Sequence, residues 1–255
     1  EQVIKRIETR FNILHDMTKA VIAGDVRAMI VTGPPGVGKS YGVEQELDKS
    51  SMLDKIAGRG IKFEVVKGAM SSIGLYCKLY NFSDPDNVLV FDDCDSILLD
   101  DLSLNILKAA LDSKKTRKIC WNTDSHTLRR EGVPDTFNFA GSVIFITNIK
   151  FDNVKSKKLR DHLEALESRC HYIDLTIDTI REKILRIKQI VTDGMLKSYA
   201  LPSETEQSIV DFIDDYKRQL REISLRTVLK IADLAKAFPE NWKDVAKQTV
   251  LKPYV

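Results

Sequence analysis

Residues 28–40 read AMIVTGPPGVGKS. Four apolar residues and a threonine predict a short buried strand. Glycines and prolines then predict a tight loop, and the pattern after Lys39 predicts a helix over 39–53. The loop fits G-x-x-x-x-G-K-[ST] at every fixed position, between a strand and a helix, which is the context that this motif requires.

A loop of this kind binds phosphate, because glycines let backbone N–H groups face phosphate oxygens and a helix N-terminus attracts anions. Lys39 is expected to reach the β- and γ-phosphates, and Ser40 to ligate Mg²⁺. A purely structural glycine-rich turn is the alternative, and the coincidence of lysine, serine and flanking elements disfavours it. The residues expected around the phosphates are Gly33, Pro34, Pro35, Gly36, Val37, Gly38, Lys39 and Ser40.

Strands and helices alternate along the first 175 residues, which predicts an α/β fold with a parallel sheet flanked by helices. After residue 176 only helical patterns remain. We therefore expect a nucleotide-binding core over 1–175 and a small all-helical lid over 176–255. The expected strands are 28–32, 61–66, 88–91, 142–147 and 171–175. The expected helices are 1–23, 39–53, 72–80, 102–112 and 157–168, then 178–199, 203–219, 224–237 and 240–250.

The apolar run 88–91 ends in Asp92 and Asp93. At the carboxyl edge of a parallel sheet such carboxylates face the ligand crevice. Asp92 is expected to hold Mg²⁺, and Asp93 to orient or activate water. Solvated loop acids are the alternative. Asp95, Asp100 and Asp101 are expected to be caps and surface charges of the next helix.

Composition limits the possible classes of protein. Lys plus Arg number 39 and Asp plus Glu 37, so the formal charge of +2 excludes a strongly basic nucleic-acid coat protein and an acidic tail protein. No apolar run approaches the roughly 20 residues of a membrane span, so we expect a cytoplasmic protein, in the host cytoplasm if it is viral, with no membrane partner. Four scattered cysteines favour reduced thiols over a zinc site.

Together, GPPGVGKS, VLVFDDCD, VIFITN and the helical tail resemble an AAA+ ATPase, over nearly the whole chain. The resemblance implies ATP and Mg²⁺ as ligands and a homo-oligomeric, hexameric ring. It implies a sensor-1 role beside Asp93 for Asn148, with Thr147 less favoured. Arg169, in a Ser-Arg-Cys triplet, resembles an arginine finger, with Arg160 as a weaker candidate, and Arg226 resembles the sensor-2 arginine of the lid. The alternatives are a helix-end arginine for Arg169 and a surface arginine for Arg226. Most AAA+ proteins carry Glu where Asp93 stands, and replication initiators of bacteria carry Asp.

A β-hairpin over about 114–141 is expected just before the strand 142–147, with strands at 118–122 and 136–139. Its placement resembles the pre-sensor-1 hairpin of replication initiators and helicases, and the compact chain resembles phage-type AAA+ proteins. Lys114, Lys115, Arg117 and Lys118 lie on its approach, and Arg129 and Arg130 at its tip. Such cations suit a phosphate backbone in a ring channel, whereas a solvated hairpin without ligand is the alternative. Trp121 is expected to pair with Phe137 or Phe139 across the hairpin.

Three functions follow as expectations. The first is an ATP-hydrolysing nucleic-acid motor, helicase-, initiator- or loader-like and acting in DNA replication, which contacts a single or double strand through Lys67, Lys118, Arg129 and Arg130. The second is a protein-remodelling ATPase or assembly chaperone, with Met70 gripping an apolar protein partner, although the loop 67–72 lacks an aromatic residue. The third is a nucleotide-gated scaffold that hydrolyses slowly because Asp93 replaces Glu.

Overall fold

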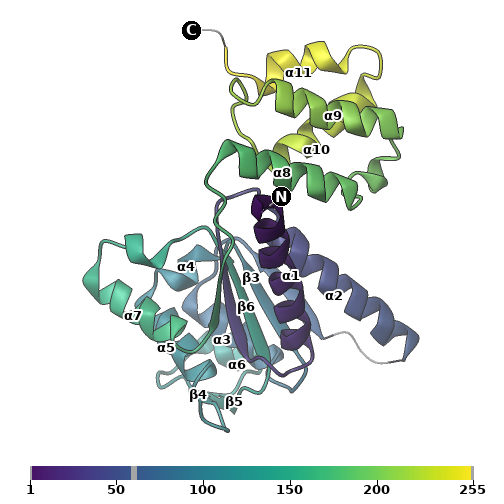
Figure 1. Ribbon diagram of the computed structural model, residues 1–255. Helices are drawn as coiled ribbons and strands as arrows, with labels where there is room; N and C mark the ends of the chain where they lie inside the picture. The colour runs from purple at the N-terminus through teal and green to yellow at the C-terminus, as the bar shows by residue number, and fades with distance from the viewer. Residues whose placement is uncertain (1, 59–61, 254–255) are drawn as a thin grey trace. The chain divides into compact units, whose positions relative to one another are not determined.

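A computed structural model describes residues 2–58 and 62–253 (Figure 1). It contains a five-stranded sheet of order β2-β3-β6-β1-β7, in which every neighbouring pair is parallel. This confirms the predicted α/β class. The strands are β1 (Ala28–Thr32), β2 (Phe63–Lys67), β3 (Val88–Asp92), β6 (Ser142–Thr147) and β7 (His171–Asp174). The expected start of the second strand at Ile61, and Glu1 of the first expected helix, lie outside the described residues.

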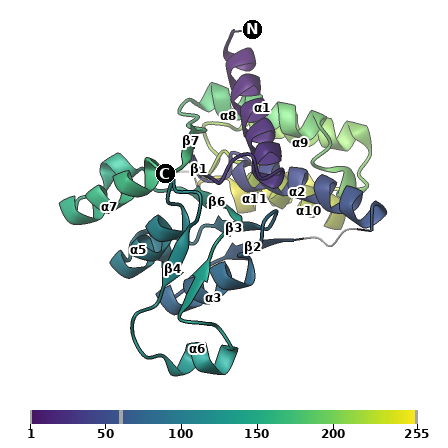
Figure 2. The same ribbon diagram turned by 90° about the horizontal axis from the view of Figure 1, so that it is seen from below.

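Helices cover both faces of this sheet, as expected because its three central strands, β1, β3 and β6, are buried along their whole length. Helices α1 and α2 lie on one face, and α3 and α5 on the other (Figure 2). The main core lies on the α3–α5 face, where Phe91 and Phe145 of neighbouring strands stack with ring centroids 5.7 Å apart. The helices are α1 (Gln2–Ile22), α2 (Lys39–Ile56), α3 (Ser72–Asn81), α4 (Asp95–Leu98), α5 (Asp101–Ala110) and α7 (Lys157–Glu167), with a 3-10 turn η1 (Phe151–Asn153).

A second, two-stranded sheet precedes β6. Strand β4 (Lys118–Cys120) pairs antiparallel with β5 (Thr136–Asn138), and the connection holds a helix, α6 (His126–Glu131), that the sequence analysis does not predict. Ser125 caps α6 through the Leu128 amide, and Gly132 ends it in the left-handed conformation. Figure 2 shows α6 at the far end of the two strands.

The expected aromatic pairing across this hairpin is wrong. Trp121 and Phe137 both pack edge-on against Tyr76 of α3, with centroids 5.5 and 5.1 Å away, and Phe139 is buried in the core. The physical reason is burial, because contact with α3 removes the rings from water whereas a cross-strand pair on an exposed ribbon leaves them solvated.

The chain divides into two compact units. One comprises 1–10, 34–38 and 176–255, and the other 11–33 and 39–175. The helical part of the first unit contains α8 (Ile180–Thr192), a 3-10 turn η2 (Lys197–Tyr199), α9 (Ser203–Asp215), α10 (Leu225–Ala237) and α11 (Trp242–Val250). The expected single helix over 178–199 is therefore interrupted, and Gly194 with a φ of 98° marks the break.

Candidate nucleotide site

Three strands of the sheet end side by side. The register sets Thr32 of β1 opposite Thr147 of β6, and Asp92 of β3 opposite Ile146. The residues that follow each strand, Gly33, Asp93 and Asn148, therefore reach the same carboxyl edge, where open α/β sheets bind ligands.

Lys39 is the hub of a hydrogen-bond chain at this edge. Its buried ammonium donates to the Gly33 carbonyl oxygen and to Asn148 Oδ1, each across 2.7 Å. Asn148 Nδ2 in turn donates to Asp93 Oδ1 across 3.1 Å. The structure thus brings together three of the predicted site residues, and it orients the Asp93 carboxylate through the amide.

The metal candidates form a second group beside the first. Ser40 Oγ donates to Asp92 Oδ1 across 2.9 Å, and Lys67 Nζ lies 3.4 Å from Asp92 Oδ2 and 2.8 Å from Glu44 Oε1. The hydrogen bond to Glu44, aided by the charge of Asp92, raises the pKa of Lys67. Lys67, predicted to contact a substrate, is thus an ion-pair partner here, and neither Glu44 nor this pairing carried a sequence signal.

A hydroxyl and a carboxylate at hydrogen-bond distance suit Mg²⁺, which binds few protein oxygens and completes its shell with water and phosphate. In the described part of the chain no group of three or more His, Cys, Asp and Glu side chains is placed to hold a metal by itself. Ser40 and Asp92 therefore fit an ion that arrives with a phosphate ligand.

Asp93 has an unusual backbone for a residue with a side chain. Its φ is 53°, in the left-handed region, and its amide donates to the Ile146 carbonyl across 2.9 Å. Asp and Asn tolerate this conformation better than longer side chains do. Nearby, Thr147 Oγ1 donates to Asp95 Oδ1 across 2.7 Å, so this threonine has a structural partner, whereas the Asn148 side chain contacts Lys39 and Asp93.

The middle of the predicted phosphate-binding loop, residues 34–38, belongs to the same compact unit as the C-terminal helices. The Leu225 amide, at the start of α10, donates to the Gly36 carbonyl across 2.8 Å. A Cβ on Gly36 would lie 2.4 Å from the Ser224 Cβ, and the φ of Gly36 is 73°, so this position requires glycine.

Arg186 of α8 also reaches this loop. The side chain is buried, and its Nε donates to the Val37 carbonyl across 3.4 Å while its Nη1 donates to Gln189 Oε1 across 2.7 Å. Sequence reasoning missed Arg186, because nothing about a lone arginine in an amphipathic helix indicates that it will contact a loop 149 residues away.

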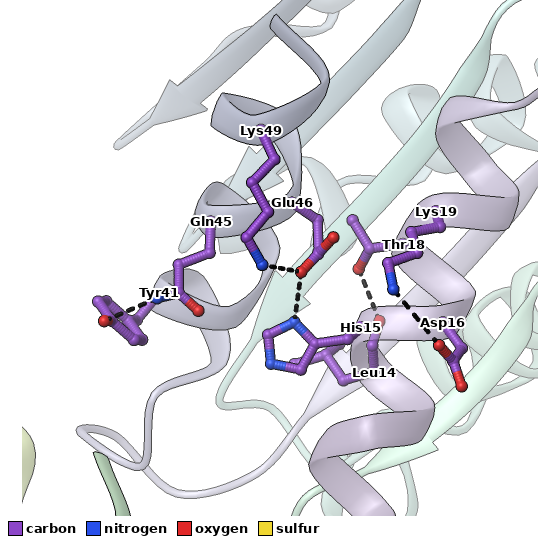
Figure 3. Close-up of polar contacts among 9 residues, drawn as sticks. All are labelled: Leu14, His15, Asp16, Thr18, Lys19, Tyr41, Gln45, Glu46 and Lys49. Atoms are coloured by element: carbon purple, nitrogen blue, oxygen red, sulfur yellow. Dashed lines mark hydrogen bonds and ion pairs between the residues drawn. The ribbon is translucent and has the colours of Figure 1, made fainter. Parts of the chain in front are cut away.

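Helix α2, which begins at Lys39, is fixed to α1 by a buried carboxylate. Glu46 Oε1 accepts from His15 Nδ1 of α1 across 3.0 Å and from Lys49 across 2.8 Å (Figure 3). Burial alone would raise the pKa of Glu46, but the bonds and charges of Lys49 and His15 together lower it. Gly42 permits the close approach, because a Cβ there would lie 2.9 Å from Leu14 Cδ2.

The arginines predicted as arginine finger and as sensor 2, Arg169 and Arg226, are both exposed. Arg169 is exposed just after α7, and its guanidinium donates to the Ala165 carbonyl of its own helix. Arg226 is exposed in the first turn of α10, in the helical unit.

The predicted substrate contacts have mixed surroundings. Lys118 is exposed on β4, whereas Arg129 pairs with Asp124 and Arg130 with Glu131. Met70 is partly buried against the core, and Ser96 bonds both its amide and its carbonyl, so Met70 is not a free apolar grip. Arg117 is buried, and it donates to the carbonyls of Ala110 and Gly141. Of the four cations expected on the approach to the hairpin, Arg117 therefore stabilises the fold and is not available to a substrate.

Among curated proteins, the chain is 34% identical over 249 residues to an uncharacterized 36.7 kDa protein of Enterobacteria phage T4 from the nrdC-mobD intergenic region. The match covers 96% of this chain and 75% of the T4 protein. The chain belongs to the family of this T4 protein. No family model matches this member of the T4 family.

Solved structures give the wider fold of this T4-family protein. Domain III of the Thermotoga maritima replication initiation protein DnaA matches with a TM-score of 0.52 at 12% identity, covering 95% of this chain and 92% of that one. The chain thus shares the fold of this DnaA domain, which agrees with the predicted α/β class. DnaA bound to AMPPCP and single-stranded DNA matches with a TM-score of 0.48 at 12% identity, covering 91% of this chain and 63% of that one. No helix in the described residues is long and apolar enough to span a membrane.

Proposed function

We propose that this protein binds ATP and hydrolyses it to ADP and phosphate, as a subunit of a homo-oligomeric, hexameric ring. The observation that carries the proposal is the hydrogen-bond chain from the Gly33 carbonyl through Lys39 and Asn148 to Asp93, with Ser40 and Asp92 beside it. A lysine at the start of α2, held together with an amide and a carboxylate that each follow a strand end, supplies groups that phosphoryl transfer to water requires.

Each side chain has a role in this proposal. Lys39 exchanges the Asn148 oxygen for phosphate oxygens when ATP binds, and its charge stabilises the transferred phosphoryl group. Asn148 and Asp93 then orient water, and Asp93 accepts the proton that water loses on attacking the γ-phosphorus. Mg²⁺, held by Ser40 and Asp92, would neutralise charge on the β- and γ-phosphates.

The substrate proposed for this ATPase is nucleic acid, as in a replication initiator, loader or helicase working in an infected host cell. Exposed Lys114, Lys115 and Lys118 at the hairpin base support it. A protein-remodelling role is disfavoured because Met70, the one apolar candidate in its loop, packs against the core. A slow scaffold is the remaining alternative, and turnover rate separates it from a motor.

The test is phosphate release at saturating ATP by the full chain and by Lys39→Ala. Lys55→Ala, an exposed lysine in the last turn of the same helix, is the matched control. We expect Lys39→Ala to lose at least about 100-fold in rate, given what positioned cations contribute to phosphoryl transfer, and Lys55→Ala to stay within about twofold of the parent. Turnover that survives Lys39→Ala would overturn the proposal.

A further inference from the structure

The helical unit contains two hollows that join into one groove. The first, of about 350 Å³, lies between α8 and the residues that end and follow α9. The second, of about 500 Å³, continues along residues 217–223 to Lys252. Both are lined by Ile180, Lys217 and Arg218, so they are contiguous. We call them together the α8–α9 groove.

Positive charge is concentrated on this groove. The first hollow is lined by Arg181, Lys188, Lys217 and Arg218 against the single carboxylate Asp214. The second adds Lys183, Arg221 and Lys252 against Glu222. Seven cations thus face two carboxylates, although the formal charge of the whole chain is only +2.

Internal ion pairs do not neutralise this excess. Lys188 and Lys217 share one carboxylate, Asp214, each at 2.7 Å. The exposed Arg181 and Arg218 line the same groove, where Asp214 already pairs with the two lysines. Several like charges on one surface repel each other, so an anion that binds there is stabilised.

The lining is also apolar in part. Ile180 is 45% exposed, and Ile184, Leu185, Leu220 and Ile223 line the hollows with it. An aliphatic surface between cations accommodates sugars and bases that are not paired, whereas a duplex presents mainly its phosphates. A nucleic-acid strand also carries one negative charge at every nucleotide. This regular charge density matches seven clustered cations better than the charge of an acidic protein segment does.

We propose that the α8–α9 groove binds single-stranded nucleic acid, with Arg181 and Arg218 contacting backbone phosphates. This is a site separate from the nucleotide site and from the β4–β5 hairpin, and it does not require ATP hydrolysis. DNA and RNA share the phosphate chemistry, and the 2′-hydroxyl distinguishes them.

The test measures fluorescence anisotropy of labelled dT20 and rU20 with the full chain, without nucleotide, over a series of salt concentrations. The double variant Arg181→Glu, Arg218→Glu should weaken binding at least about 10-fold and reduce the salt slope by about 1.4, since each phosphate contact on a single strand contributes about 0.7. Lys230→Glu, Lys236→Glu, on α10 outside the groove, is the control with the same charge change and should have a smaller effect. If charge reversal unfolds the unit, Arg181→Gln, Arg218→Gln gives the same direction with a smaller loss.

An equal loss of affinity in the groove and control variants would mean that only net charge matters, and it would overturn the proposal. Unchanged affinity in the groove variant would overturn it as well. Loss confined to Lys115→Glu, Lys118→Glu would move the site to the hairpin and also overturn it. Binding of a poly-glutamate peptide, but of neither oligonucleotide, would assign the groove to an acidic protein instead. Tighter binding of rU20 than of dT20 would support the site and assign it to RNA. Lys39→Ala should bind the strand normally, so failure of the ATPase proposal and failure of this one are distinguishable.

Discussion

The Leu225 amide donates a hydrogen bond to the Gly36 carbonyl oxygen, and the two atoms are 2.8 Å apart. Leu225 is the first residue of α10 and Gly36 is the midpoint of the phosphate-binding loop. An N–H in the first turn of a helix has no partner within the helix, so this donor stabilises the loop at no cost to helix geometry. The loop conformation is therefore coupled to the position of α10.

Leu225→Pro tests that coupling. Proline suits the first helical position, and Ser224 already has the extended backbone that a following proline favours, so α10 should persist while the donor is lost. Leu225→Ala keeps the amide and removes most of the side chain, which makes it the control. We expect the proline variant to bind ATP about 10-fold more weakly than the alanine variant, as loss of about one hydrogen bond predicts. Equal affinities, measured by titration calorimetry, would show that the bond does not position the loop.

Asp93 offers a test of the proposed base. Asp93→Asn retains the shape and tolerates the φ of 53° but cannot accept a proton, so ATP should bind normally and turnover should fall at least about 100-fold. Asp93→Glu introduces the longer acid, which strains the left-handed backbone, so it should destabilise the fold by about 1 kcal/mol. Phosphate release and urea unfolding measure the two effects. Faster turnover in Asp93→Glu at unchanged stability would contradict this reasoning.

Subunit mixing tests whether Arg169 acts on a neighbour. Arg169→Ala and Lys39→Ala subunits should each be inactive alone, because each lacks one half of every site. Mixed in equal amounts, they should regain part of the activity, since some interfaces then combine an intact Lys39 with an intact Arg169 from the next subunit. No recovery, in assemblies shown to mix, would leave Arg160 as the next candidate.

Glu46→Gln should weaken the fold in a pH-dependent way. The pKa of Glu46 is lowered in the folded state, so its ionised form adds stability above the ordinary value of 4.5, and this stability is lost as the pH falls through the folded pKa. At pH 7 the variant should be less stable than the parent by about 1.5–3 kcal/mol, the range for hydrogen bonds to charged groups. The difference in unfolding free energy between parent and variant should become smaller below pH 4.5. Urea unfolding at pH 7 and pH 3.5 measures it, with exposed Glu164→Gln as control.

Arg117 is predicted to stabilise the fold and not to bind substrate. Burial, reinforced by the charge of Arg27, lowers the pKa of Arg117 to about 10, and its guanidinium lies 5.2 Å from the centre of the Phe139 ring. Arg117→Met leaves two carbonyls without this donor and should cost about 2–4 kcal/mol of unfolding free energy. Lys115→Met, two residues away and exposed, should change it by less than about 0.5 kcal/mol. Similar losses of unfolding free energy in both variants, measured by thermal or urea unfolding, would contradict a structural role for Arg117.

Local chemistry made much of the fold predictable. The apolar runs at β1, β3 and β6, each ending in Gly, Asp or Asn, reveal buried parallel strands whose ends meet at one edge. The roles proposed for Lys39, Ser40 and Asp92 follow from the same pattern, because a fixed spacing on one strand–loop–helix unit determines which side chains face a phosphate.

Only the tertiary structure decided the contacts between residues distant in sequence. Arg117 looks like the exposed lysines beside it, yet packing against Phe139 buries it. Arg186 and Leu225 reach the phosphate-binding loop, and the cations of the α8–α9 groove converge, only because separate helices meet in space. Periodicity reports which face of a helix is buried, but the free energy that selects its partner comes from side-chain packing over the whole chain.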